Sequence, residues 1–220
     1  MGKRATFIQR RTMLCIALAL VGAMLATAAA APAKTKPCGI CGKNLIKNPS
    51  AEAGAGIMAV GAYGAVPGWT SESGQFGAAS YAFPNGWFPK SSKGSPKRGK
   101  NYFYGGTTTA AIDAKATIGM QTIKLPAAAA GHAVTLSGWL GNYGKNTAQV
   151  RAQFADAGGK VLASLRIGPD STIAGTDMAF RSRKGKVPPG AKQVILVVTF
   201  GGTTTTYKLA GADELSLVLT

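Results

Sequence analysis

The fold class is indicated by the run KQVILVVTF at positions 192–200. This run is almost continuously apolar and rich in β-branched residues, which favours a strand buried near the centre of a sandwich. Two further stretches alternate apolar and polar residues, VTLSGWL at 134–140 and VRAQF at 150–154. Alternation with a period of two is typical of strands that bury one face. The intervening segment 142–146 carries Gly144, and it predicts a hairpin between the two strands.

The remaining strand candidates are short and are separated by glycine, proline and polar residues. They are 78–83, 101–105, 116–125, 161–167, 178–183 and 215–219. No window shows a sustained helical period, and the alanine run 127–130 ends at Gly131 and indicates a turn. About nine short strands with this punctuation predict an all-β fold, an antiparallel β-sandwich of the jelly-roll type.

The composition supports a folded, cationic domain. The chain has 220 residues, of which 46% are hydrophobic, enough for one domain with a substantial core. It has 25 basic and 8 acidic residues and a formal net charge of +17, which favours anionic partners. A single histidine makes histidine-based catalytic dyads and His-rich metal sites difficult to build. The sequence therefore disfavours a conventional hydrolase, and we expect no enzymatic activity.

The first 31 residues have the pattern of a secretory signal peptide. Four basic residues within positions 1–11 precede the apolar run 13–26, and small residues with A-x-A spacing follow up to position 33. The apolar run is shorter than the roughly 20 residues that a membrane-spanning helix needs. We therefore expect a secreted protein with no transmembrane segment after cleavage. The sequence RRTML at 10–14 resembles a twin-arginine signal, so Sec export and twin-arginine export both remain open.

Residues 32–43 are predicted to be a leader between the signal and a domain spanning 44–220. The leader contains Cys38 and Cys41 in the sequence PCGICG. In an oxidising compartment a disulfide is the expected state of such a pair. A redox motif would need this spacing at the start of a helix, and a zinc site would need a second pair of ligands. The pair is accordingly interpreted as a small disulfide staple.

Several short motifs together resemble secreted galactose-binding-like jelly-roll domains, the fold of many carbohydrate-binding modules. They are NLIKNPSAE at 44–52, GW at 68–69, GKNYF at 99–103, QTI at 121–123, VTLSGW at 134–139 and ADELSL at 212–217. The resemblance covers nearly the whole predicted domain in the expected order. It implies binding rather than catalysis and does not identify a ligand.

The same resemblance implies a structural calcium ion that joins the opening segment to the last strand. The matching positions are Glu52 and Asp213, with Asn101 as a further candidate ligand. Ca²⁺ takes about six to eight oxygen ligands and accepts them from distant parts of a chain. The alternative is that both carboxylates cap turns or pair with lysines.

A candidate ligand-binding face follows from the alternation of the two predicted hairpin strands. If the apolar residues pack inward, Trp139 points outward together with Arg151 and Gln153. An aromatic ring beside hydrogen-bonding side chains suits a sugar ligand. Trp87 lies in a loop-like segment and is a candidate aromatic at the rim of the site, whereas Trp69 is predicted to belong to the core. Ordinary packing of Trp139 is the alternative.

Two basic clusters are further candidates for binding carboxylates, phosphates or sulfates. The first contains Lys90, Lys93, Lys97, Arg98 and Lys100, and the second contains Arg181, Arg183, Lys184 and Lys186. Solvated surface charge is the alternative. Nucleic acid is a disfavoured partner, because strand alternation would bury part of the aromatic run 102–104 that follows the first cluster.

Two functions remain open from the sequence. The first is a secreted non-catalytic carbohydrate-binding module for a polysaccharide or cell-wall glycan, with an anionic polysaccharide favoured by the charge. The second is a structural or cell-envelope interaction protein that uses the jelly roll as a scaffold without specific sugar binding. A saturable, salt-resistant response to one glycan class distinguishes the first from the second.

Overall fold

The computed structural model describes residues 38–173, 175–202 and 207–220. The predicted signal peptide (1–31) and the first part of the leader (32–37) lie outside these residues. None of the helices in the described ranges has the length and apolar character needed to cross a membrane.

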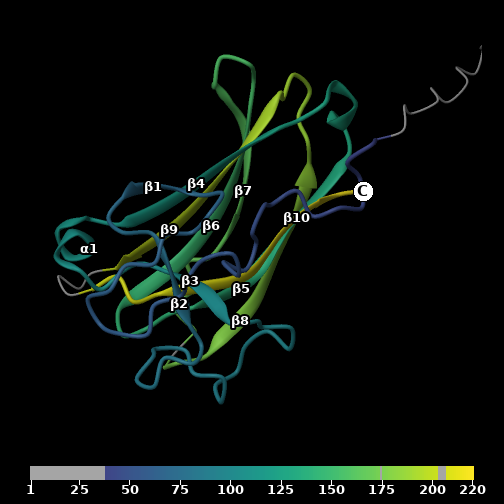
Figure 1. The fold of residues 1–220 in the computed structure, drawn as a ribbon. Helices are drawn as coiled ribbons and strands as arrows, with labels where there is room; N and C mark the ends of the chain where they lie inside the picture. The colour runs from purple at the N-terminus through teal and green to yellow at the C-terminus, as the bar shows by residue number, and fades with distance from the viewer. Residues whose placement is uncertain (1–37, 174, 203–206) are drawn as a thin grey trace, which may run out of the picture. The chain divides into compact units, whose positions relative to one another are not determined.

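In the described part of the chain, ten strands form two antiparallel five-stranded sheets. Figure 1 shows how the strands are arranged in the two layers. Sheet I has the order β1-β4-β9-β6-β7, and sheet II has the order β2-β3-β10-β5-β8. The strands are β1 (Thr70–Ser73), β2 (Gly77–Ser80), β3 (Asn101–Tyr104), β4 (Thr117–Lys124), β5 (Ala133–Gly141), β6 (Asn146–Ala155), β7 (Val161–Ile167), β8 (Met178–Lys186), β9 (Gln193–Gly202) and β10 (Gly211–Leu219). The predicted all-β antiparallel jelly-roll sandwich is confirmed.

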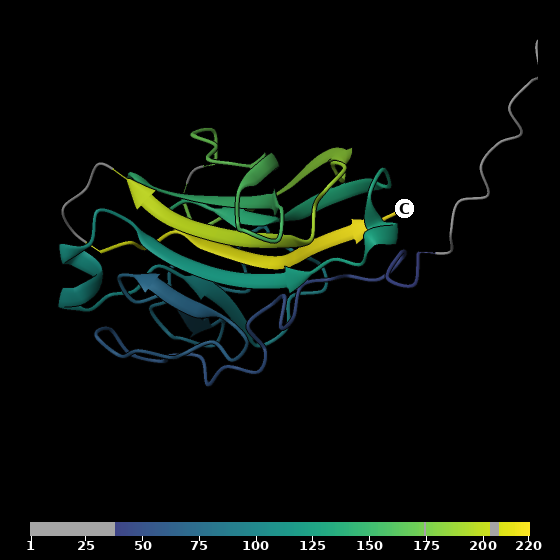
Figure 2. The ribbon, with the colours of Figure 1, turned by 90° about the horizontal axis from the view of Figure 1, so that it is seen from above.

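Two short helical elements interrupt this strand pattern. Helix α1 spans Thr109–Asp113, and a 3₁₀ turn spans Ala127–Ala129. Figures 1 and 2 place α1 at the end of the sandwich opposite the C-terminus. The polar edge strand β1 was not predicted, because TSES lacks the apolar alternation of a half-buried strand.

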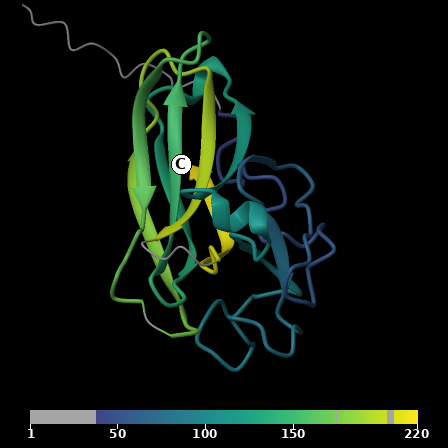
Figure 3. The same cartoon turned by 90° about the vertical axis from the view of Figure 1, so that its left-hand side faces the viewer.

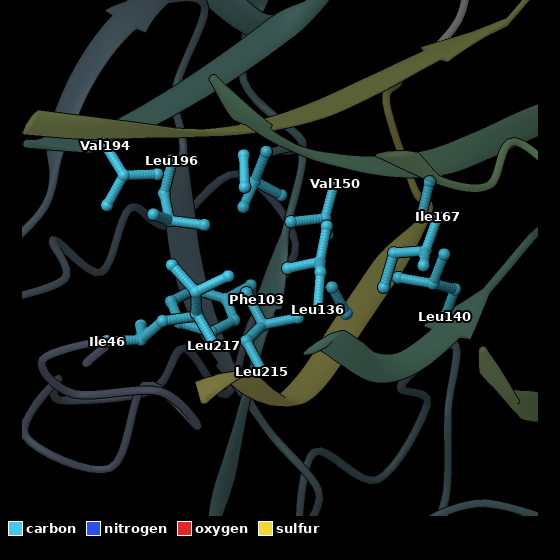
Figure 4. Close-up of a cluster of buried hydrophobic side chains, with 14 of the residues drawn as sticks. Ile46, Phe103, Leu136, Leu140, Val150, Ile167, Val194, Leu196, Leu215 and Leu217 are labelled. Carbon is cyan, nitrogen blue, oxygen red and sulfur yellow. The ribbon is translucent and has the colours of Figure 1, made fainter. Parts of the chain in front are cut away.

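The core lies between the sheets. Strand β9 is central in sheet I, between β4 and β6, which confirms the expectation from its continuous apolar run. Figure 4 shows Val194 and Leu196 of β9 pointing across the interior toward Leu217 of β10. The side chains of all three residues are fully buried. Burying a side chain of this size contributes about 1.5–3 kcal/mol.

The predicted hairpin between β5 and β6 is wrong. Strand β5 pairs with β10 and β8 in sheet II, whereas β6 pairs with β9 and β7 in sheet I. The connection between them therefore crosses from one sheet to the other. Buried Asn142 holds this crossing, because its amide donates to the carbonyls of Asp170 and Ile173 and accepts from the backbone N–H of Ala148. Alternation cannot separate the two arrangements, since either one turns the apolar faces of both strands toward the same interior.

The described part of the leader packs on the sandwich. Cys38 and Cys41 form a disulfide, and both residues lie against the main core with Ile40 between them. The backbone N–H of Gly42 donates to the carbonyl of Leu219 at 2.8 Å. The folded unit thus includes residues N-terminal to the predicted boundary at 44.

Candidate functional site

The outer face of sheet II is divided into a covered half and an open half. The loop formed by residues 81–98 folds back over the part of sheet II that contains β2 and β3. Figure 3 shows the blue chain that precedes β3 along one side of the sandwich. A second buried cluster lies beneath this loop, separate from the core between the sheets. Its members are Ile57, Ala79, Tyr81, Phe83, Trp87, Phe88, Tyr102, Tyr104, Met178 and Leu209.

Glycines in the strands allow the loop to approach the covered half closely. A Cβ atom at Gly141 of β5 would overlap the ring of Phe88, and one at Gly211 of β10 would lie 2.8 Å from it. Trp87 stacks on Tyr104 with ring centroids 6.0 Å apart and is only 7% exposed. The prediction that Trp87 is a rim aromatic is therefore corrected, because its loop folds onto the sheet.

The open half carries an aromatic pair. Trp139 of β5 and Phe180 of β8 lie directly opposite each other, with ring centroids 5.8 Å apart. Phe180 is 51% exposed and Trp139 is half-buried at the edge of the second cluster. Sequence reasoning missed Phe180, although the alternation of β8 could have identified it as an outward-facing residue.

Three serine hydroxyls continue the open half along the strands. Ser137 of β5 lies opposite Ser182 of β8 on one side and Ser216 of β10 on the other. Within the described residues, none of these hydroxyls makes a hydrogen bond. The next pair along the strands is Thr135 with exposed Lys184. We call Trp139, Phe180, Ser137, Ser182, Ser216 and Lys184 the outer strip.

Arg151 and Gln153 lie on the other side of the molecule from Trp139. Both belong to β6 of sheet I, where Arg151 faces Arg166 and Gln153 faces Ser164 on β7. The predicted site that combined them with Trp139 is not assembled, and the cause is the wrong hairpin. Their predicted exposure on an outer face is consistent with alternation in β6, whose apolar partners are buried in the core.

A basic hollow of about 420 Å³ lies at the edge where β7 and β8 approach each other. It is lined by Ser164, Leu165, Arg166, Gly168, Arg183 and Lys184. Lys184 belongs to both the hollow and the outer strip. Neither Arg166 nor Arg183 has a carboxylate partner within the described residues. Such a hollow favours an anionic ligand, because a carboxylate or sulfate would pair with the positive charges of Arg166 and Arg183.

Two predicted basic side chains have structural partners instead. Arg98 donates to backbone carbonyls of its own loop, including that of Ser92 at 2.8 Å, and lies over the ring of Tyr81. Arg181 pairs with Asp170, and hydrogen bonds from Thr172 together with this pairing lower the pKa of Asp170 to about 2. In the first basic cluster, Arg98 therefore stabilises its own loop. In the second cluster, Arg183 and Lys184 line the hollow.

The aromatic run 102–104 offers no surface for stacking of nucleic-acid bases. Tyr102, Phe103 and Tyr104 are all fully buried in the two hydrophobic clusters. Trp69 packs against Phe76 and Phe103 at the edge of the main core, as predicted.

The predicted calcium residues connect the opening loop to β3. The Glu52 carboxylate accepts the backbone N–H groups of Lys100 and Asn101, each at 2.9 Å. The amide of Asn101 donates to the carbonyls of Ala51 and Gly54. Both residues also line a hollow of about 360 Å³ beside the loop. Both of these hydrogen bonds use the side-chain nitrogen of Asn101, so its side-chain oxygen is the candidate ligand atom for a cation.

Asp213 is a fully buried carboxylate in the bulge of β10. It accepts hydrogen bonds from the Tyr81 hydroxyl and the Glu214 backbone N–H, both at 2.7 Å. Burial raises its pKa to about 7, and the charges of Glu214 and Glu52 act in the same direction. No described basic side chain forms an ion pair with it. Asp213 interacts electrostatically with Glu52 and Glu214, but within the described residues these three carboxylates do not form a cluster with their oxygens at ligand distance from one another, so calcium binding by Glu52 and Asp213 stays a prediction.

Comparison with known proteins identifies similarity of fold. No family model matches the chain, and no curated protein matches it. The Stig cyclase Fisc from Fischerella sp. TAU, solved with (3Z)-3-(1-methyl-2-pyrrolidinylidene)-3H-indole, has a TM-score of 0.55 at 16% identity over 80% of this chain and 96% of its own. The enzymatically active domain of bacteriophage CBA120 tailspike protein 4 has a TM-score of 0.53 at 17% identity. That match covers 80% of this chain, which spans only 21% of the tailspike chain.

Carbohydrate-binding modules are also among the similar solved structures. A family 16 carbohydrate-binding module matches with a TM-score of 0.47 and 20% identity, over 80% of this chain and 99% of its own. The Fisc and tailspike matches are below 25% identity, so these two structures show a shared fold alone. At that level the resemblance to jelly-roll domains predicted from the sequence is confirmed.

Proposed function

We propose that the protein is a non-catalytic carbohydrate-binding module whose ligand lies along the outer strip. The observation that carries this proposal is the pairing of half-buried Trp139 with exposed Phe180, beside three serine hydroxyls that have no hydrogen-bond partner among the described residues. Aromatic rings pack against the apolar C–H faces of sugars, and hydroxyls exchange hydrogen bonds with sugar hydroxyls. These groups suit recognition of a glycan.

The proposed ligand is an acidic polysaccharide, such as an anionic cell-wall glycan. Lys184 lies at one end of the strip, and beyond it the hollow presents Arg166 and Arg183. Along β8, Phe180 and Lys184 are about 13 Å apart, at roughly 3.3 Å per residue. A short oligosaccharide can therefore contact the aromatic pair while its carboxylate or sulfate reaches the hollow. Without residues 1–31 the chain keeps 21 basic and 8 acidic residues, and this net charge of +13 supports attraction of such a ligand.

Export and calcium binding are further parts of the proposal. Residues 1–31 would act as the signal peptide, which would place the domain in the compartment where extracellular glycans occur. Calcium would be held by Glu52 and Asp213 and would have a structural role. Asp213 is fully buried and accepts the Tyr81 hydroxyl, and its partner across the strands is Trp139, so the ion would lie beneath the aromatic end of the strip.

The test is a glycan-array screen of the purified protein at low and high salt, followed by calorimetry on the glycan class that responds. We expect Trp139→Ala and Phe180→Ala each to weaken binding by about 30-fold, corresponding to roughly 2 kcal/mol for an anchoring aromatic residue. Tyr63→Ala is the matched control, because Tyr63 is also an aromatic residue that is 45% exposed but lies off the strip. It should leave the affinity within about twofold.

Two outcomes would reject the proposal. One is specific binding that neither strip variant weakens. The other is broad binding to every polyanion that disappears at high salt, which is the behaviour of a charged scaffold. The second outcome would favour the structural or cell-envelope interaction protein.

A further inference from the structure

Three side chains that bind thiophilic metals converge at one end of the sandwich. Cys38 and Cys41 precede the first strands, whereas His132, the single histidine, lies just before β5. The Sγ of Cys41 is 3.5 Å from the Nδ1 of His132, although 91 positions separate them in the sequence. The ligand atoms of all three residues lie within 4.8 Å of one another, and all three residues are half-exposed. Within the described ranges this is the one cluster of three such side chains.

The convergence is produced by the fold and not by the cysteine spacing. On one side, the Cys41 backbone N–H donates to the Cys38 carbonyl, and the next residue, Gly42, is bonded to Leu219 at the end of β10. On the other side, the carbonyl of His132 accepts the N–H of Val187 at 3.0 Å. Figures 1 and 2 show the purple start of the described chain beside the C-terminus. Both halves of the cluster are therefore anchored independently to strand ends.

We propose that Cys38, Cys41 and His132 form a binding site for Zn²⁺ when the disulfide is reduced. Two thiolates and one imidazole are typical zinc ligands, with Zn–S near 2.3 Å and Zn–N near 2.0–2.1 Å. In a tetrahedral site these lengths separate sulfur from nitrogen by about 3.6 Å and the two sulfurs by about 3.8 Å. In the disulfide form the Cys41 Sγ already lies 3.5 Å from Nδ1, and reduction frees the two bonded sulfurs to move apart. Three protein ligands leave a fourth position for water or for the Thr220 carbonyl, which lies 3.3 Å from Nδ1.

Loading the site requires a balanced exchange of electrons and protons. A dithiol or phosphine reductant supplies two electrons, and two protons complete the Cys38 and Cys41 thiols as the reductant is oxidised. Zn²⁺ then displaces both thiol protons to form two metal–thiolate bonds. His132 binds through the lone pair of Nδ1 with its proton on Nε2, so it gives up any hydrogen bond donated from Nδ1 to Thr220. The disulfide form has no thiolates and cannot hold the metal in this way.

The experiment uses the full chain with Cys15→Ser, so that every thiol belongs to the proposed site. The protein is reduced with a phosphine under anaerobic conditions and titrated with Co²⁺, whose thiolate charge-transfer absorption reports sulfur ligation. Zn²⁺ affinity is then measured by competition with a chelator. We expect one equivalent of metal per chain. His132→Ala should weaken Zn²⁺ binding by more than about 100-fold, beyond the 10–100-fold typical of outer-shell partners.

Controls separate metal binding from loss of the fold. Circular dichroism should show that His132→Ala keeps the β-sheet spectrum. In the protein with intact Cys38 and Cys41, Zn²⁺ should protect both thiols from alkylation, a measurement that needs no ligand variant. The oxidised protein should show no cobalt–thiolate absorption. Absence of stoichiometric binding by the reduced protein, or equally tight binding after His132→Ala, would overturn the proposal.

Discussion

The covered and open halves of sheet II share strands but differ in what lies above them. Beneath the loop, β5 and β10 carry Gly141 and Gly211, which allow Phe88 to pack directly on the strands. In the open half the same two strands carry Ser137 and Ser216. An aromatic side chain on this face is therefore core or platform according to whether a loop covers it. The difference suggests that the strands of sheet II form one continuous outer face, and that the area left open for binding depends on how far the loop of residues 81–98 covers it.

The largest expected effect tests this division through stability. Phe88 is 2% exposed and contacts Tyr102 edge to face, whereas Phe180 is 51% exposed. We expect Phe88→Ala to lower the free energy of unfolding by about 3–5 kcal/mol, as for other buried aromatic residues. Phe180→Ala should lower it by less than about 1 kcal/mol, since little area is lost from the interior. Urea denaturation of both variants measures the contrast, and equal losses would contradict the division.

The second prediction concerns pH and the buried carboxylate at the margin of the covered half. The pKa of Asp213 is raised to about 7 in the folded protein, so the folded state binds more protons than the unfolded state between about pH 4 and 7. In chelator, stability should therefore be greatest at low pH and fall as the pH rises through this window. The slope approaches about 1.4 kcal/mol per pH unit, with a total loss of a few kcal/mol.

Two variants and one ion test the cause of this slope. Asp213→Asn should flatten it, whereas Asp113→Asn, at an exposed position in α1, should leave it unchanged. Ca²⁺ should restore stability near pH 8, because a bound cation compensates the ionised carboxylate. The readout is the thermal unfolding midpoint at each pH. An unchanged slope in Asp213→Asn would assign the effect to another group.

The sequence was sufficient to predict most of the strands but not their pairing into sheets or the composition of the site. Alternation correctly predicted the β5 and β6 strands and the buried centre of β9, because inward-facing residues must be apolar in any sandwich. Alternation could not reveal that β5 and β6 belong to different sheets. That placement is what separates Trp139 from Arg151 in the structure. Trp87 was misplaced for a related reason, since local sequence does not reveal whether a loop folds outward or onto a sheet.

The metal-binding candidates show the same limit. The disulfide staple was expected from Cys38 and Cys41, and the structure joins the two residues. Nothing in the local sequence indicated that His132 would lie beside Cys41, because that contact depends on where two strand ends meet. Long-range neighbours of this kind are determined by topology, whereas periodicity reports only on each strand's own faces.

The third prediction tests the open half through charge. Lys184→Ala should weaken binding of an acidic oligosaccharide by about three- to tenfold at low salt, with a smaller effect at high salt because the interaction is partly screened. A neutral oligosaccharide should be nearly unaffected. Lys124→Ala removes the same charge from the end of β4 in sheet I and serves as the matched control. Equal losses in both variants would indicate general charge attraction instead of a defined site.

The smallest expected effect compares two neighbouring tyrosines inside the covered half. Both are fully buried, but the Tyr104 hydroxyl donates to the Ala62 carbonyl at 2.9 Å. Within the described residues the Tyr102 hydroxyl makes no hydrogen bond of acceptable geometry, although backbone groups of Trp87 and Phe88 lie near it. Tyr104→Phe should cost about 1 kcal/mol, the usual net contribution of one hydrogen bond. Tyr102→Phe removes an unsatisfied buried group, so stability should stay the same or rise by up to about 1 kcal/mol. Urea denaturation of the pair provides an internally matched test, because each variant removes one oxygen from the same cluster. A larger loss in Tyr102→Phe would show that its hydroxyl is satisfied in solution and that the loop packs less closely over β3 than the structure indicates.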